Sequence, residues 1–242
     1  MLTGKTALVT GASGGIGRAT AVMLAQRGCR VILSGRSGRR LDETASACGG
    51  SSNIAICAGD LTRAATLEEL QRQVGLGSDS GLHILVHSAA DLLHGAVERV
   101  DIDALRRLLE INVVASFALL GAMTPLLGAD SDVVFLNSTH GISAPAGVGP
   151  YAASKYALHA LAEAFRAEVN SRGIRVTSVF CGKTATEMQQ RIYDGRGEGG
   201  RYEQIKDEIT RPQDVAEVIA LAVSLPRTTE LTDIHLRPLK KT

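Results

Sequence analysis

The sequence of 242 residues predicts an α/β fold: a doubly wound parallel sheet of about seven strands with helices on both faces. Short apolar runs alternate with longer amphipathic runs along the chain, which is typical of repeated βαβ units. A glycine-rich turn joins the first apolar run to the first helical run. Aromatic residues make up only 3% and tryptophan is absent, so small aliphatic residues must pack helices closely onto a buried sheet.

Each element follows from this alternation. Strands are expected at 5–10, 30–34, 53–57, 83–88, 132–137, 174–180 and 233–236. Helices are expected at 18–27, 63–74, 101–127, 151–172 and 212–224. Because no internal repeat or linker separates them, residues 1–242 are predicted to form one domain.

The charge balance and the cysteines limit the classes of partner that the protein is expected to bind. Lys and Arg number 26 against 25 Asp and Glu, a net charge of +1, which gives no field for nucleic acid or an acidic membrane. The longest uncharged run, 113–129, contains Gly121 and Pro125 and is shorter than the ~20 residues of a membrane span, so a buried helix is expected. Four cysteines without Cys-x-x-Cys spacing, and no signal peptide, indicate a reduced, cytoplasmic protein with a small-molecule partner.

The first predicted strand runs directly into Gly11, Gly15 and Gly17 before a helix begins. Glycines allow a tight turn and close approach of a ligand, and the free amides at the helix start attract a pyrophosphate. The spacing differs from Gly-x-Gly-x-x-Gly, so a plain turn before a helix is the alternative.

The second strand ends at Gly35-Arg36, about where a dinucleotide-binding chain recognises the adenosine ribose. A chain that binds NAD places an acid there, whereas an arginine suits the 2′-phosphate of NADP. The alternative is that Arg36, Arg39 and Arg40 only solvate the start of a helix.

Tyr151 and Lys155 lie four apart at the start of a predicted helix, so the ammonium is expected beside the phenol, where it would lower the pKa of the tyrosine. Ser138, thirteen residues earlier at the end of a strand, could hold the oxygen of a substrate. A second pair, Tyr202 and Lys206, has the same spacing but lies in a charged run and is expected on a solvated helix face.

Other polar positions leave alternatives open. Asn112 interrupts the long apolar helix, and either local backbone groups satisfy its amide or it serves a site. His83 and His87 lie in a strand without a cysteine or acid cluster, so no metal site is expected. The glycine-rich segment at about 187–210 is expected to be a mobile flap with few buried side chains, over a moderately apolar substrate with a polar end.

Together these features resemble the short-chain dehydrogenase/reductase family, a Rossmann-like fold, over 5–236. Thr10-Gly-x3-Gly15-Ile16-Gly17 is similar to its cofactor loop, and Asp60-Leu61 to its adenine-side pair. The resemblance implies a catalytic tetrad of Asn112, Ser138, Tyr151 and Lys155, in which serine orients the carbonyl, tyrosine transfers the proton, lysine binds the ribose and asparagine supports a water relay. Together with Arg36 at the end of the second strand, the resemblance implies a set of cofactor-binding residues. They are Gly11, Ser13, Gly15, Ile16, Gly17, Arg36, Asp60, Leu61, Ala89, Tyr151, Lys155, Gly182, Thr184 and Thr186.

The resemblance implies an NADP(H)-dependent oxidoreductase acting on a carbonyl or secondary alcohol, with NAD less favoured, and a homodimer or homotetramer. The sequence departs from the family's pattern at three places, which bear on how tightly the cofactor binds and on assembly. Residues 87–90 read His-Ser-Ala-Ala, Cys181 replaces a proline, and the end after Leu236 lacks the family's usual motif. The alternatives are a non-catalytic dinucleotide-binding sensor or scaffold, and epimerase or dehydratase chemistry, which the short flap disfavours.

Overall fold

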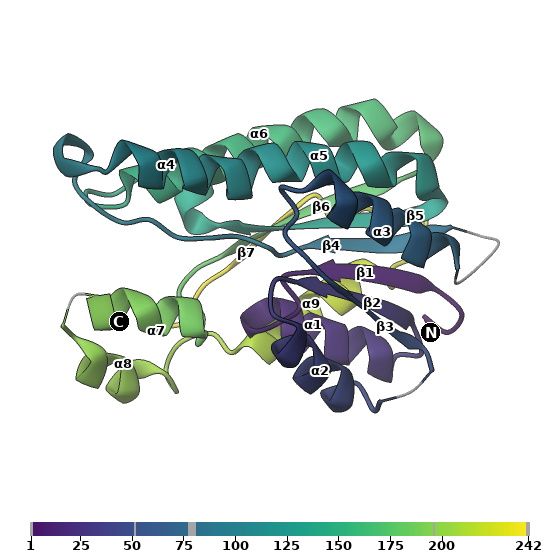
Figure 1. Ribbon diagram of the computed structural model, residues 1–242, viewed down its shortest axis with the longest axis horizontal. Helices are drawn as coiled ribbons and strands as arrows, with labels where there is room; N and C mark the ends of the chain where they lie inside the picture. The colour runs from purple at the N-terminus through teal and green to yellow at the C-terminus, as the bar shows by residue number, and fades with distance from the viewer. Residues whose placement is uncertain (1, 51, 77–80, 196, 241–242) are drawn as a thin grey trace.

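The computed structural model describes residues 2–50, 52–76, 81–195 and 197–240. In this part of the chain one seven-stranded sheet is formed, with all strands parallel, in the order β3-β2-β1-β4-β5-β6-β7 (Figure 1). The predicted Rossmann-like sheet is confirmed. The strands are β1 Thr6–Thr10, β2 Arg30–Gly35, β3 Ile54–Ala58, β4 Leu82–His87, β5 Leu127–Ser138, β6 Arg175–Cys181 and β7 Asp233–Leu236.

Helices cover both faces because successive strand residues point to opposite sides. Leu8 packs into one apolar cluster, and its neighbours Ala7 and Val9 pack into the other. Figure 1 shows the two helical layers above and below the sheet. On Leu8's face lie α3 Ala64–Gly75, α4 Ile102–Leu109, α5 Ala115–Met123 and α6 Gly149–Val169; on the other lie α1 Gly15–Gln26, α2 Gly38–Ala47 and α9 Pro212–Ala222.

The long helix expected at 101–127 is interrupted at the predicted asparagine. A π-helical turn, Glu110–Val114, separates α4 from α5. Such turns are rare and occur often at functional sites. The expectation of a buried helix is only half right, since Leu119 and Met123 are buried while Phe117 is 57% exposed.

By length and composition alone, the helical run Ile102–Leu126 could cross a membrane. Core helices of soluble proteins meet the same criterion. Here the run packs through Leu119 and Met123 into the apolar cluster on one face of the sheet.

The order in which the chain adds strands to the sheet reverses between β1 and β4. From β1 the chain proceeds outward to β2 and β3, and α3 then returns it to β4, on the other side of β1. The connections that leave the carboxyl ends of β1 and β4 therefore diverge, and ligands of open α/β sheets bind in the crevice formed there.

The segment at 187–210 differs from the expectation. Its described residues form two helices, α7 Glu187–Gly195 and α8 Gly199–Ile205, drawn as a separate lobe beyond β6 in Figure 1. Tyr193, Tyr202 and Ile209 are buried together at 4%, 6% and 4% exposure. These three are the only buried residues among the described ones of the segment, as the expectation of few buried side chains predicted. The expectation of a solvated Tyr202 was wrong, because its ring packs against Tyr193.

Candidate active site

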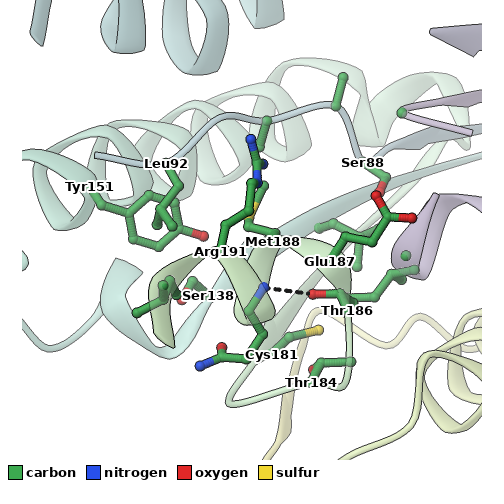
Figure 2. Close-up of a pocket in the computed structure, with 18 of the residues that line it drawn as sticks. Ser88, Leu92, Ser138, Tyr151, Cys181, Thr184, Thr186, Glu187, Met188 and Arg191 are labelled. Atoms are coloured by element: carbon green, nitrogen blue, oxygen red, sulfur yellow. Dashed lines mark hydrogen bonds between the residues drawn. The ribbon is translucent and has the colours of Figure 1, made fainter. Parts of the chain in front are cut away.

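A cavity of about 840 Å³ lies at the carboxyl ends of the strands. Figure 2 shows Tyr151 and Ser138 at one end of it and Ser88 at the other. Of the predicted site residues, only Gly17 and Asn112 are not on its wall. Those that line it are Gly11, Ser13, Gly15, Ile16, Arg36, Asp60, Leu61, Ala89, Ser138, Tyr151, Lys155, Gly182, Thr184 and Thr186.

The glycine loop needs its glycines for close packing. Gly11 has a φ of +66°, and a Cβ there would lie 2.8 Å from the Ala89 nitrogen. Gly17 lies behind the loop, where a Cβ would overlap the Gly11 carbonyl. Gly14 is the N-cap of α1, with no side-chain cap and no acidic residue in the first turn. The first amides of α1 are therefore suited to hold a phosphate group.

The end of β2, where the sequence predicted recognition of the ribose, lines the cavity. A Cβ on Gly35 would lie 3.1 Å from Ser13 Oγ, so the two positions are in close contact. The exposed Arg36 follows directly. Across from it, hydrogen bonding from the Thr62 amide lowers the pKa of Asp60, and the charge of Arg36 contributes to this.

The catalytic candidates are brought together by β5 and α6. Ser138 ends β5, and its Oγ accepts from the His140 amide at 3.1 Å, which fixes the hydroxyl's position. Tyr151 and Lys155 lie in the first two turns of α6. Lys155 Nζ donates to the Leu136 carbonyl at 2.9 Å and lies 5.8 Å from the centroid of the Tyr151 ring.

Burial dominates the electrostatics of this group. Desolvation raises the pKa of Tyr151 to about 12, opposed in part by a hydrogen bond with Ser138. Desolvation also lowers the pKa of Lys155 to about 8. The predicted lowering of the tyrosine pKa by the lysine is therefore wrong for this state of the protein, since burial outweighs any effect of the cation.

Comparison with known proteins agrees with this geometry. The sequence profile described as "short chain dehydrogenase" matches residues 5–197. The chain belongs to the short-chain dehydrogenase/reductase family. An uncharacterized oxidoreductase of Staphylococcus aureus is 26% identical over 241 residues, covering 99% of both chains. A dehydrogenase/reductase from Sinorhizobium meliloti has a TM-score of 0.85 and 28% identity, covering 97% of this chain and 94% of its own.

A short-chain dehydrogenase from Burkholderia cenocepacia, solved in complex with NADP, has a TM-score of 0.85 and 28% identity, covering 97% of both chains. This protein is accordingly a short-chain dehydrogenase/reductase, an oxidoreductase that works with a nicotinamide dinucleotide. The glycine cradle and the uncapped start of α1 fit the phosphates of such a cofactor.

In this short-chain dehydrogenase the Asn112 side chain bridges two neighbouring segments. Its Oδ1 accepts from the Asp91 amide at 2.7 Å, and its Nδ2 donates to the Asp91 carbonyl and the Ser154 hydroxyl at 2.9 and 3.0 Å. Ser154 Oγ donates to the Tyr151 carbonyl at 2.8 Å. Asn112 thereby connects the π-helical turn to α6, the helix that carries Tyr151 and Lys155. The catalytic role of all three stays a prediction.

The unusual His87 belongs to a chain of hydrogen bonds between β1 and that turn. Thr10 Oγ1 accepts from two backbone amides after β4, so its proton is available to His87 Nδ1 at 3.1 Å. The Nε2 hydrogen then points to Ser116 Oγ at 2.7 Å, and Ser116 donates to the Asn112 carbonyl at 2.8 Å. Burial, and then repulsion by Lys155, lowers the pKa of His87 to about 3, so the ring is neutral.

His83 and Cys181, at two further positions that the sequence singled out, are explained by their local surroundings. His83 Nδ1 accepts from the Thr6 amide at 3.1 Å, joining β4 to β1. Among the described residues, no group of three or more His, Cys, Asp or Glu could hold a metal ion. Cys181, which ends β6, is a free thiol whose pKa burial raises to about 12.

Sequence reasoning missed the residues beside the tyrosine. The rings of His94 and His140 lie edge-on to Tyr151, with centroids 6.1 and 6.3 Å away. Both line the cavity. Neither belongs to a recognisable motif. His94 lies far from α6 in the sequence, and only the closeness of His140 to Ser138 could have indicated a role for it.

Proposed function

We propose that this protein is an NADP(H)-dependent oxidoreductase that transfers a hydride between nicotinamide and a carbonyl or secondary alcohol of a small, moderately apolar substrate. One observation carries the proposal: Ser138 and Tyr151 lie together at one end of the cavity, and the Lys155 ammonium lies 5.8 Å from the centroid of the Tyr151 ring. When bound, the dinucleotide supplies or accepts the hydride.

The chain's own residues handle the proton. Tyr151, with a pKa of about 12, carries its proton at neutral pH and can donate it to a carbonyl oxygen that Ser138 holds by a hydrogen bond. As the proton leaves, the Lys155 ammonium stabilises the phenolate. Asn112 positions the tyrosine indirectly, because it donates to Ser154, which in turn donates to the Tyr151 carbonyl on α6. A sensor or scaffold would not need these groups together.

Preference for NADP(H) is supported by Gly35-Arg36, where no acid is present to receive a ribose hydroxyl. A guanidinium–phosphate contact contributes roughly 1.5–3 kcal/mol, so NADPH should be preferred over NADH by about ten- to a hundredfold. The test is kcat/KM for both cofactors at low and high salt, because salt should erode the margin.

Two variants test this assignment. Arg36→Gln adds no atoms and should remove most of the margin. Gly35→Asp with Arg36→Ala should reverse it, although Ser13 must shift slightly to accept the new side chain. Equal use of NADPH and NADH by the wild type would show that Arg36 only solvates a helix start.

The substrate end of the cavity is mostly apolar with a polar margin. Val148, Met188 and Ile192 line it together with His94 and the cation Arg191. Figure 2 shows Arg191 near Leu92 and Met188. A screen of carbonyls and alcohols with apolar bodies and one polar end, followed by NADPH absorbance, tests the activity; no turnover of any compound would favour the sensor.

For assembly and location we propose a cytoplasmic homodimer or homotetramer. Val114 at the end of the π-helical turn, Phe117 on α5 and Tyr156 on α6 are 50%, 57% and 44% exposed, and a second copy of the chain could cover them. The four thiols are free, which suits a reducing compartment. Light scattering of the wild type and Phe117→Asp tests the assembly, since the charge should dissociate an oligomer formed through these residues.

A further inference from the structure

One ion pair joins α2 to α7 on the wall of the cavity. Arg40 on α2 donates through Nη2 to both carboxylate oxygens of Glu187, at 2.6 and 2.5 Å. Glu187 is the first residue of α7, 147 positions further along the chain. The pair therefore connects the helix after the ribose-side strand to the lobe at the substrate end.

The Arg40 guanidinium lies directly over the glycine loop. A Cβ placed on Gly14 would lie 2.5 Å from Arg40 Nη2 and 3.8 Å from Glu187 Oε1. Glycine at this position therefore leaves the space that the guanidinium occupies. Gly14 is also the uncapped N-cap of α1, so the Glu187 carboxylate lies where a cation and a helix N-terminus both favour an anion.

Resting on the proposed use of NADP(H), we propose that Arg40 is a second cation for the 2′-phosphate and that Glu187 occupies it until the cofactor binds. A phosphate monoester carries about −1.5 to −2 charges against −1 for the carboxylate, and should therefore displace it. The displaced pair is weak, since its side chains are 34% and 64% exposed.

The exchange has two consequences. Glu187 competes with the phosphate for Arg40, and thereby limits the preference for NADP(H). Once the phosphate takes Arg40, Glu187 faces an anion, so α7 loses its attachment to α2. NADP(H) should therefore loosen the start of α7, whereas NAD(H), which lacks the phosphate, should not.

The test measures dissociation constants of the full chain for NADP+ and NAD+ by calorimetry. Arg40→Gln should weaken NADP+ binding about tenfold and change NAD+ binding less than about twofold. Glu187→Gln should tighten NADP+ binding about two- to fivefold. In the Arg40→Gln background, Glu187→Gln should have no further effect, because the cation for which it competes is absent.

Arg39→Gln is the matched control. Arg39 is the neighbouring arginine on α2, but its side chain is 81% exposed and pairs with Glu43, so both constants should stay unchanged. Hydrogen exchange gives a second measurement: amides of 187–195 should exchange faster with NADP+ and not with NAD+.

Equal losses for NADP+ and NAD+ in Arg40→Gln would overturn the inference, since the guanidinium would then bind the pyrophosphate that both share. An unchanged NADP+ constant in that variant would also overturn it. A wild-type protein that binds neither dinucleotide would instead refute the proposed function.

Discussion

The chain contains two Tyr-x-x-x-Lys pairs, and comparing them shows what makes one of them a site. Both tyrosines are buried, Tyr151 at 9% exposure and Tyr202 at 6%. Their lysines differ. Lys155 is 3% exposed and donates to a backbone carbonyl, whereas the Lys206 side chain is 43% exposed and pairs with Glu203 at 2.6 Å.

The surroundings then set different chemistry. Burial lowers the pKa of Lys155, while the hydrogen bond to Glu203 raises that of Lys206. The Tyr151 ring lines the cavity, and the Tyr202 ring packs against Tyr193 with centroids 5.9 Å apart. The spacing places each lysine near its tyrosine on one helix face, and only the packing of that face decides whether the pair can meet a substrate.

The largest expected difference is in turnover. Tyr151→Phe should lower kcat by about 10²–10⁴-fold and leave NADPH binding nearly intact, because only the proton donor is lost. Tyr202→Phe should lose far less. Steady-state kinetics and NADPH titration measure both, and undiminished turnover by Tyr151→Phe would remove the distinction between the pairs.

The second difference is in stability. The folded pKa of Lys155 is lower than its usual 10.5, so the folded state resists protonation and the buried cation destabilises it at pH 7. Lys155→Met should raise the free energy of unfolding by about 2 kcal/mol at pH 7, after allowing for the lost hydrogen bond, while weakening cofactor binding and turnover.

That gain depends on pH with a definite sign. Between pH 8 and 10.5 the unfolded chain holds a proton at Lys155 that the folded protein has lost, so wild-type stability rises and the gain shrinks. Lys206→Met should change stability little at any pH. Urea unfolding from pH 6.5 to 10 checks this, and a constant gain across the range would contradict the assigned cause.

The smallest expected effect concerns the hydrogen bonds that join Thr10, His87 and Ser116 behind Tyr151 and Lys155. Among the described residues, the pair of Tyr202 and Lys206 has no such network. His87→Asn is too short to reach both Thr10 and Ser116, so one hydroxyl loses its partner, at a cost of about 1–2 kcal/mol. The folded pKa of His87 is lowered from 6.5 to about 3, so wild-type stability is full above pH 6.5 and falls below it.

The variant lacks this titrating group and should lose less stability than the wild type between pH 7.5 and 5. Urea unfolding at both values measures the difference. Ser116→Ala, which breaks the same chain of hydrogen bonds but keeps the imidazole, should retain the pH dependence. Identical slopes for the wild type and His87→Asn would show that the ring is not held neutral.

Local pattern in the sequence was sufficient for the sheet and for the glycine loop and the tyrosine–lysine pair on the cavity wall. All seven strands were predicted, six of them from apolar runs, because a strand buried on both faces is apolar at nearly every position. The edge strand β7 instead alternates exposed and half-buried residues. The loop from Gly11 to Gly17 and the pair Tyr151 and Lys155 were found because turn and helix geometry connect residues only a few positions apart. Asn112 was noticed as a polar break in an apolar helix.

Tertiary structure decided everything that depends on residues far apart in the chain. Thr10 meets His87 across 77 positions, and Arg40 meets Glu187 across 147. It also buried Tyr202, which sequence placed in solvent, and raised the pKa of Tyr151, which sequence expected to fall. Helical and strand periods specify which residues share a face of an element. The desolvation and the charges that act on those residues depend on what packs against that face, which is decided only by the tertiary fold.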